Sequence, residues 1–221
     1  MTHHSVADDC IIGLVTKPPT RAERRKAELR QDIIDTAFVQ FAERGYHATG
    51  IADIATELGI GHGTFYRYFS NKRDIIDHVI DDLAARIVGA LGTENAPDAA
   101  TTLDEYRAQI DRIGVALTHI LVEDRRVAQL LLFHATGIDD ELTARLYGLL
   151  DTADTLTAGY LEHGVELGYL REDLDTLNTA RAITGMLLAG IVHGLRDPDD
   201  SAIAALNAAI RRLLIDGVRK D

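Results

Sequence analysis

The residues from Gly50 to Phe69 constrain the fold more than any other segment of this chain. Ile54 and Leu58 lie one helical turn apart and form a short apolar stripe. Gly59 follows where a helix would end in a left-handed conformation, which glycine adopts at little cost. Phe65 then falls where an apolar side chain would fill the angle between two helices. This spacing predicts a helix-turn-helix, and an ordinary corner between two helices is the alternative.

The second predicted helix has a polar outer face that has no evident packing role. Hydrogen-bonding and cationic side chains on such a helix are those that contact bases and phosphates in the major groove. The candidate DNA contacts are Thr49, Gly50, Gly61, His62, Gly63, Thr64, Tyr66, Arg67, Tyr68 and Lys72. His62, Thr64 and Arg67 are placed to read bases. The two tyrosines and Lys72 are placed to hold phosphates.

Amphipathic segments flank the motif on both sides. Residues 30–44 carry apolar side chains at helical spacing and stop at Gly45, and a longer helix opens after Asn71. The residues that fit one known pattern are Phe41-Ala42, Gly45-Tyr46, Thr49, Ile54-Ala55, Gly59-Ile60, Gly63-Thr64-Phe65-Tyr66, Tyr68-Phe69 and Lys72. On this pattern, which covers about a quarter of the chain, the sequence resembles the TetR family of bacterial one-component transcription regulators.

The resemblance implies a repressor that leaves a palindromic DNA operator when a small, mainly apolar inducer binds. It also implies an N-terminal three-helix DNA-binding domain followed by a larger helical domain. This chain departs from the family pattern at Gly50 and Gly61, where Ser or Thr is usual. Glycine permits the backbone geometry of a helix N-cap but has no hydroxyl to cap the helix or to reach a phosphate.

The net charge of −12 is divided unevenly along the chain. Residues 17–73 hold ten bases and seven acids, a net charge of +3, whereas residues 74–221 hold 13 bases and 26 acids, a net charge of −13. We therefore expect the N-terminal part to face DNA and the remainder to be repelled by phosphate. The basic run from Arg21 to Arg30 is either a solvated helix face or an arm that lies along the DNA.

Several classes of protein are disfavoured by the sequence. The single cysteine excludes an internal disulfide framework and fits a reducing cytoplasm. We find neither an apolar run long enough to span a membrane nor a secretion signal, so we expect a cytoplasmic protein without membrane contact. The HExxH, GxSxG and glycine-rich phosphate-loop motifs are absent. No enzyme activity, cofactor or metal is therefore expected.

Helical periodicity without strand alternation predicts an all-α protein of about nine helices. We expect a flexible tail over residues 1–19, a helix-turn-helix domain over 20–71, and a ligand-binding and dimerisation domain over 72–221. Within the last domain, helices are expected over about 102–122, 127–133 and 140–167, and two more follow. The short apolar helix over 127–133 is expected to be buried on most sides.

The C-terminal domain offers two candidate surfaces. By analogy with the family, its middle helices should enclose an apolar pocket, although residues of this kind are more often ordinary core than ligand contacts. The candidate lining residues are Tyr106, Gln109, Ile113, Leu117, Leu130, Phe133, His134, Tyr147, Tyr160 and Met186. The last two helices are apolar enough to form a homodimer interface, with burial inside one subunit as the alternative. The candidate interface residues are Ile183, Leu187, Gly190, Ile191, Gly194, Ile203, Leu206, Ile210 and Leu213.

Three functions remain open at this point. The first is a ligand-responsive repressor, in which an unknown small molecule shifts the spacing of two reading heads. The second is a DNA-binding regulator with a filled core, which is controlled by a protein partner or is constitutive. The third and most remote is an all-helical enzyme. A cavity between the middle helices separates the first from the second, and DNA binding separates both from the third.

Overall fold

The computed structural model describes residues 20–92, 95–196 and 199–220, so the predicted flexible tail lies outside the described residues. Apart from one isolated bridge between Leu170 and Arg219, all regular structure in these ranges is helical, as predicted. The helices are α1 (Arg21–Arg44), α2 (Ile51–Glu57), α3 (His62–Phe65), α4 (Lys72–Leu91), α5 (Leu103–Thr118), α6 (Arg125–Gln129), α7 (Asp140–Glu166), α8 (Thr176–Arg196) and α9 (Asp200–Val218). Two π-helical turns, η2 (His119–Glu123) and η3 (Leu130–His134), flank α6.

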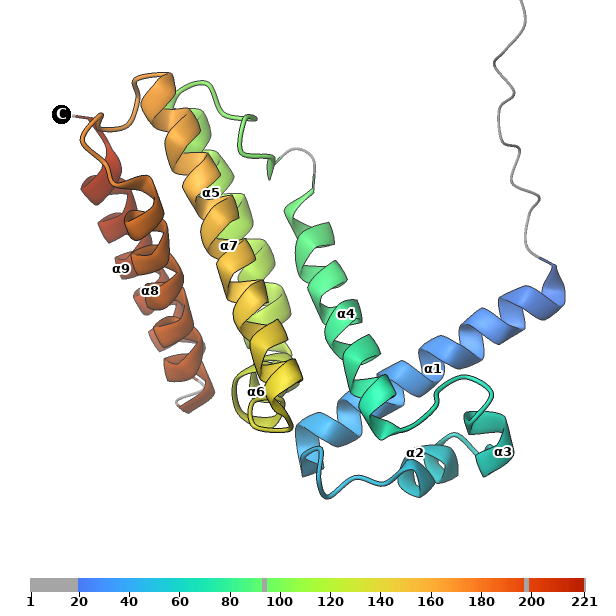
Figure 1. Cartoon of the computed structure of the whole chain (residues 1–221). Coiled ribbons are helices and arrows are strands. Elements are labelled where there is room, and N and C mark those ends of the chain that lie inside the picture. Colours follow the sequence, from blue (N-terminus) through green and yellow to red (C-terminus); the bar gives the residue numbers. More distant parts are fainter. Residues whose placement is uncertain (1–19, 93–94, 197–198, 221) are drawn as a thin grey trace, which may run out of the picture.

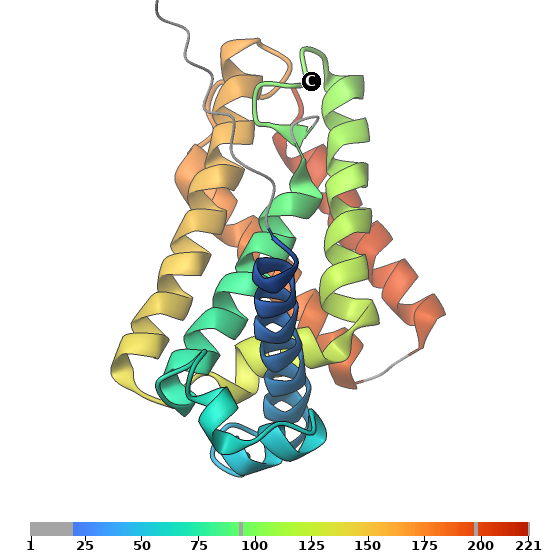
Figure 2. The same cartoon turned by 90° about the vertical axis from the view of Figure 1, so that its right-hand side faces the viewer.

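Helices α1, α2 and α3 form a head at one end of the molecule, and α4, α5, α7, α8 and α9 form a bundle above it (Figure 1). Helix α4 rises out of the head, and α5, α7, α8 and α9 run roughly alongside it. Helix α1 crosses α4 (Figure 2) and packs against it. Gln31 Nε2 on α1 donates to Asp82 Oδ1 on α4 at 3.2 Å. The head is therefore joined to the bundle by packed helices rather than by a free linker.

Helix α1 begins nine residues before the position predicted from its apolar stripe. Thr20 and Glu23 form a capping box, in which Thr20 Oγ1 accepts from the Glu23 N–H and Glu23 Oε2 accepts from the Thr20 N–H. The first turns are exposed on all sides, so no hydrophobic periodicity indicated them. The basic run from Arg21 to Arg30 consequently lies on a helix.

Two apolar clusters stabilise the fold. The lower cluster joins the head to the bundle, because side chains of α1, α2, α3 and α4 pack there with Val127, Leu130 and Leu142 from α6, η3 and α7. The upper cluster lies at the other end of the bundle and contains Tyr106 and Leu161. Burial of this apolar surface is the main favourable term in folding.

The π-helical turns divide segments that periodicity predicted as continuous helices. The predicted helix over 102–122 ends as α-helix at Thr118, and the predicted helix over 127–133 is split between α6 and η3. A π-turn adds a residue to the helical repeat and rotates the side chains that follow it. Val127 and Leu130 are buried, but Phe133 is 56% exposed. The expectation that this segment is buried on most sides is therefore wrong for Phe133.

No helix in the described part of the chain is both long and apolar enough to cross a membrane.

Candidate nucleic-acid interface

The junction between α2 and α3 has the geometry that the sequence predicted. Gly59 has a φ of +63°, the left-handed conformation that ends α2. The Ile60 N–H then donates to the Ala55 carbonyl at 2.9 Å and closes the turn. Ala55 and Phe65 are both almost completely buried where the two helices meet. The turn thereby fixes the direction in which α3 leaves the head.

The outer face of α3 and of the turn that follows it is open to solvent. His62 and Gly63 on α3 and Tyr66 and Arg67 in the turn are exposed, and 55% of the Tyr66 surface is accessible. Thr64 is half-buried. Figure 1 places α3 at the far end of the head, away from α5, α7, α8 and α9. A short helix presented in this way, with donors and a guanidinium on its free side, can contact base edges and phosphates in a major groove.

Thr49 does not belong to this surface, so its prediction as a DNA contact is corrected. Its side chain is 1% exposed, and its hydroxyl lies within hydrogen-bonding distance of the Gly45 carbonyl at 3.0 Å and of the Gln40 carbonyl at 3.2 Å. Gln40 lies in the last turns of α1, and Gly45 directly follows this helix, where a backbone oxygen has no intrahelical partner. Thr49 therefore stabilises the connection from α1 to α2.

Lys72 also has an internal role that its sequence position did not indicate. Its ammonium donates to the carbonyls of Tyr46 at 2.7 Å and Thr49 at 3.0 Å, and Nζ lies 4.1 Å from the centroid of the Tyr46 ring. Burial lowers the pKa of Lys72. An ammonium has three donors, so one remains for a phosphate. Lys72 thus links the first turn of α4 to the segment that precedes α2.

The comparisons with known proteins agree with this geometry. Residues 33–79 match the family model described as bacterial regulatory proteins, tetR family. The fatty acid metabolism regulator protein of Bacillus subtilis (strain 168) is 24% identical over 195 residues, which are 88% of this chain and 98% of that protein. The HTH-type transcriptional repressor KstR2 of Rhodococcus jostii (strain RHA1) is 29% identical over 168 residues, which are 73% of this chain and 77% of that protein.

The chain belongs to the TetR family.

A solved structure extends the likeness to the whole fold of this TetR-family protein. The FadR regulator of Bacillus subtilis, solved in complex with stearoyl-CoA, superposes with a TM-score of 0.70 at 24% identity. The match covers 85% of this chain and 98% of that chain. The head and the helical bundle of this chain are therefore arranged as in that regulator.

The two glycines at which this TetR-family protein departs from the pattern have different surroundings. The Gly50 N–H donates to Asp53 Oδ2 at 2.7 Å, and a Cβ on Gly50 would lie 3.1 Å from that oxygen. Gly61 is the N-cap of α3, has a φ of −75° and forms no side-chain cap. A Cβ on Gly61 would meet no atom within 4 Å in the described structure. A hydroxyl can therefore be added at Gly61 without strain.

We expect Gly61→Ser to tighten operator binding by up to about 1 kcal/mol, the scale of one net hydrogen bond. The added hydroxyl would cap α3 or reach a phosphate. Fluorescence anisotropy of labelled operator measures the change, with Gly61→Ala as the matched variant that adds Cβ but no oxygen. Weaker binding by both variants would mean that the DNA backbone approaches Gly61 too closely for any side chain.

The predicted pocket residues of this TetR-family protein do not gather in one place. Six are buried or half-buried on α5, α7 and α8, namely Tyr106, Gln109, Ile113, Leu117, Tyr160 and Met186. At the upper end, Gln109 Nε2 donates to the Ala96 carbonyl at 2.7 Å, and the Tyr160 hydroxyl donates to the Asn95 carbonyl. Burial raises the pKa of Tyr160. These polar groups therefore hold the loop between α4 and α5, and a ligand role for the six stays a prediction.

The other four lie at the lower end of the bundle. Leu130 is fully buried in the lower cluster, and His134 Nδ1 lies 2.9 Å from the Phe41 carbonyl on α1. Phe133 and Tyr147 are 56% and 64% exposed. The prediction that these two aromatics line an internal pocket is wrong, because η3 and the outer side of α7 turn them to solvent.

The predicted interface residues lie mostly within the single subunit. Those that are buried or half-buried are Ile183, Gly190, Ile191, Gly194, Ile203, Leu206 and Ile210. A Cβ on Gly190 would lie 3.2 Å from Ile210 Cδ1, so α8 and α9 pack closely there. Leu187 and Leu213 remain 36% and 65% exposed. The assignment of Ile183, Gly194 and Ile210 to an intersubunit surface is therefore corrected, whereas dimerisation itself stays a prediction.

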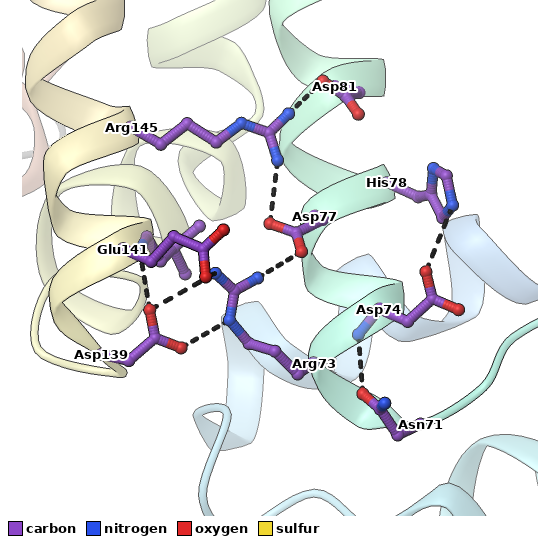
Figure 3. Close-up of polar contacts among 10 residues, drawn as sticks. Asn71, Arg73, Asp74, Asp77, His78, Asp81, Asp139, Glu141 and Arg145 are labelled. Carbon is purple, nitrogen blue, oxygen red and sulfur yellow. Dashed lines mark hydrogen bonds and ion pairs between the residues drawn. The ribbon is translucent and has the colours of Figure 1, made fainter.

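A chain of ion pairs joins α4 to α7 just above the head, and no sequence motif indicated it (Figure 3). Arg73 Nε donates to Asp139 Oδ2 at 2.5 Å, and the same guanidinium pairs with Asp77. Arg145 on α7 pairs with Asp77 at 2.8 Å and also with Asp81. The hydrogen bonds with Asp77 and Asp139 raise the pKa of Arg73. The network ties the first turns of α4 to the beginning of α7.

Proposed function

We propose that this protein is a transcriptional repressor that binds a palindromic operator as a homodimer and is released by a small, mainly apolar ligand. The observation that carries the DNA-binding part is the open face of α3 and of the turn that follows it, where His62, Tyr66 and Arg67 are exposed. Because α2 and the turn hold α3 rigidly, these side chains enter a major groove together. His62 and Arg67 are assigned to base edges, and Tyr66, Tyr68 and the remaining N–H of Lys72 to phosphates.

Exposed stripes on the last two helices support dimerisation. Ala182, Gly185 and Ala189 form an exposed stripe on α8, and Ala202, Ala205, Ala209 and Leu213 form one on α9. Both helices lie at the outer edge of the bundle (Figure 1). Small side chains allow helices of two subunits to approach closely, as in four-helix interfaces. A two-fold axis through this edge would place two reading heads on successive half-sites of a palindrome.

The repressor and ligand assignments draw on the relatives. KstR2 is named as a transcriptional repressor, and the solved FadR is bound to stearoyl-CoA. In this chain, the lower cluster connects the bundle to the head, and the Arg73 network ties α7 to the first turns of α4, which lead out of the head. A ligand that changes the position of α7 or α6 would therefore shift α4 and α1. An effector acts in this way only if its affinity differs between the operator-bound and the released arrangement of the helices.

A ligand-independent regulator is the second candidate, because the ten predicted pocket residues do not enclose a common space. Two hollows on the surface of the bundle are lined by other residues. One lies beside Arg107 and Arg211, and the other lies beside Arg86 and Arg126. In that case the core is filled, and operator binding is either controlled by a protein partner or constitutive.

Sequencing the genomic fragments that the protein retains tests the proposed function most directly. A palindromic motif with two half-sites centred about 10 base pairs apart, or a multiple of that spacing, is expected. Retention without sequence preference would contradict a specific operator. The genes beside the operator also indicate which metabolites to test as ligands.

The ligand switch has a quantitative signature. A ligand that lowers operator affinity by a coupling free energy of about 1–3 kcal/mol must itself bind more weakly, by the same factor, in the presence of operator. Calorimetric titrations of stearoyl-CoA with and without saturating operator measure both sides of this cycle. Equal ligand affinities in the two titrations would leave a DNA-binding regulator that this ligand does not control.

A further inference from the structure

A cationic groove lies on the bundle, next to the helices that contact the head. Its volume is about 520 Å³, and it lies between α4, η2 and α6. The groove is lined by Arg86, His119, Ile120, Asp124, Arg125 and Arg126. Three arginines face a single aspartate there, although residues 74–221 have a net charge of −13. The groove is thus a local positive site on an otherwise acidic domain.

Arg126 is the arginine of this groove that forms an ion pair with Asp124 in the described part of the chain. Arg126 Nε and Nη2 donate to the two carboxylate oxygens of Asp124 at 2.9 and 3.0 Å. This hydrogen bonding lowers the pKa of Asp124, and the charge of Arg86 contributes less. Neither Arg86 nor Arg125 has an ion pair with a carboxylate in the described part of the chain. Two guanidinium groups therefore remain able to hold an anion.

The surroundings of Arg125 favour a bound anion over simple solvation. Its side chain is half-buried at the first position of α6. Partial burial of an unpaired cation costs free energy, which a bound anion would offset. Ile120 lines the same groove, is 7% exposed and belongs to the lower cluster. The groove thus combines cationic walls with an apolar contact.

We propose that this groove binds the phosphate-bearing end of an amphiphilic effector, of the chemical class of a coenzyme A thioester. Guanidinium forks match the oxygens of a phosphate and hold them through paired hydrogen bonds. The apolar acyl part would pass over Ile120 toward the core. This inference rests on the proposed function and identifies the class of its ligand.

The groove is connected to the DNA-binding head through Arg126. The Arg126 guanidinium lies 5.7 Å from the centroid of the Phe38 ring on α1, and α6 packs against α1. A phosphate in the groove would compete with Asp124 for the Arg126 guanidinium. Occupation of the groove would therefore change a contact of the helix that supports the head.

Calorimetry with four probes tests the site: stearoyl-CoA, coenzyme A, stearate and inorganic phosphate. Arg125→Gln is expected to weaken binding of stearoyl-CoA and coenzyme A at least about tenfold, the equivalent of one hydrogen bond to a charged group, and to leave stearate binding unchanged. Arg86→Gln should act in the same direction and serves if Arg125→Gln does not fold. Arg107→Gln is the matched control, because Arg107 is a half-buried arginine of the same domain outside the groove.

Release of labelled operator is measured in parallel, so that the groove and the proposed function can fail separately. If the wild-type protein and Arg125→Gln bind stearoyl-CoA with equal affinity, the groove is not the binding site. If stearate binds as tightly as stearoyl-CoA and releases operator equally, the proposed phosphate site in the groove is contradicted, but the proposed repressor function is not. If inorganic phosphate binds as tightly as the coenzyme A compounds, the proposal that the ligand is an amphiphile is contradicted. A wild-type protein that binds none of the phosphate compounds overturns the proposal, and failure to bind operator overturns the function itself.

Discussion

Ala209→Glu is expected to convert the protein into a monomer that has lost most of its affinity for operator. Ala209 lies on the exposed stripe of α9, so a carboxylate there does not disturb the subunit but would be buried unpaired in the proposed interface. A monomer also loses the effective concentration that the second head provides, which is a factor of about 10²–10⁴. Sedimentation should give about 24.2 kDa in place of twice that mass.

Two further variants make this test specific. Ala144→Glu adds the same charge at an exposed position of α7 and should leave the dimer intact. Ile210→Glu should instead lower the free energy of unfolding, because Ile210 is 8% exposed and packs within the subunit. A dimeric, fully active Ala209→Glu protein would place the interface elsewhere on the surface.

Lys72→Met is expected to lower the free energy of unfolding by about 2–3 kcal/mol, because it removes two hydrogen bonds from a charged donor, one to the Tyr46 carbonyl and one to the Thr49 carbonyl. Operator affinity should fall on all sequences alike, since the α1 to α2 connection is no longer held against α4. Chemical denaturation and anisotropy measure the two effects, and Lys220→Met is the control at an exposed lysine.

The dependence on salt separates the two roles of Lys72. If its remaining N–H holds a phosphate, the slope of log affinity against log salt concentration becomes shallower by roughly one unit. An unchanged slope with reduced stability would assign Lys72 to positioning alone. Unchanged stability, affinity and slope together would contradict both roles.

The parts of the structure that depend on neighbouring residues were predicted well. The turn at Gly59 and the burial of Ala55 and Phe65 follow from spacing within one short segment. Thr49 was misassigned because its partners are the carbonyls of Gln40 and Gly45, and a threonine before a helix has the same appearance in sequence whether its hydroxyl faces a phosphate or a carbonyl.

Features that depend on distant residues were not predictable from one sequence. Arg73 and Asp139 are 66 positions apart, and their pairing follows from the placement of α4 against α7. Phe133 was misassigned because a π-turn interrupts the 3.6-residue period on which the prediction depended. The groove around Arg125 brings together residues of three elements, and no local motif indicates such a convergence.

The length of α4 has a mechanical consequence. Its 20 residues make a rod about 30 Å long, and only Ser70 and Asn71 separate it from the buried Phe69 of the head. If the upper end of such a rod is held, a tilt of about 6° moves its lower end by about 3 Å, close to the rise of one base pair, ~3.4 Å. Two heads that swing in opposite directions would lose register with consecutive grooves of the duplex. A tilt of this size would then be sufficient to free the operator.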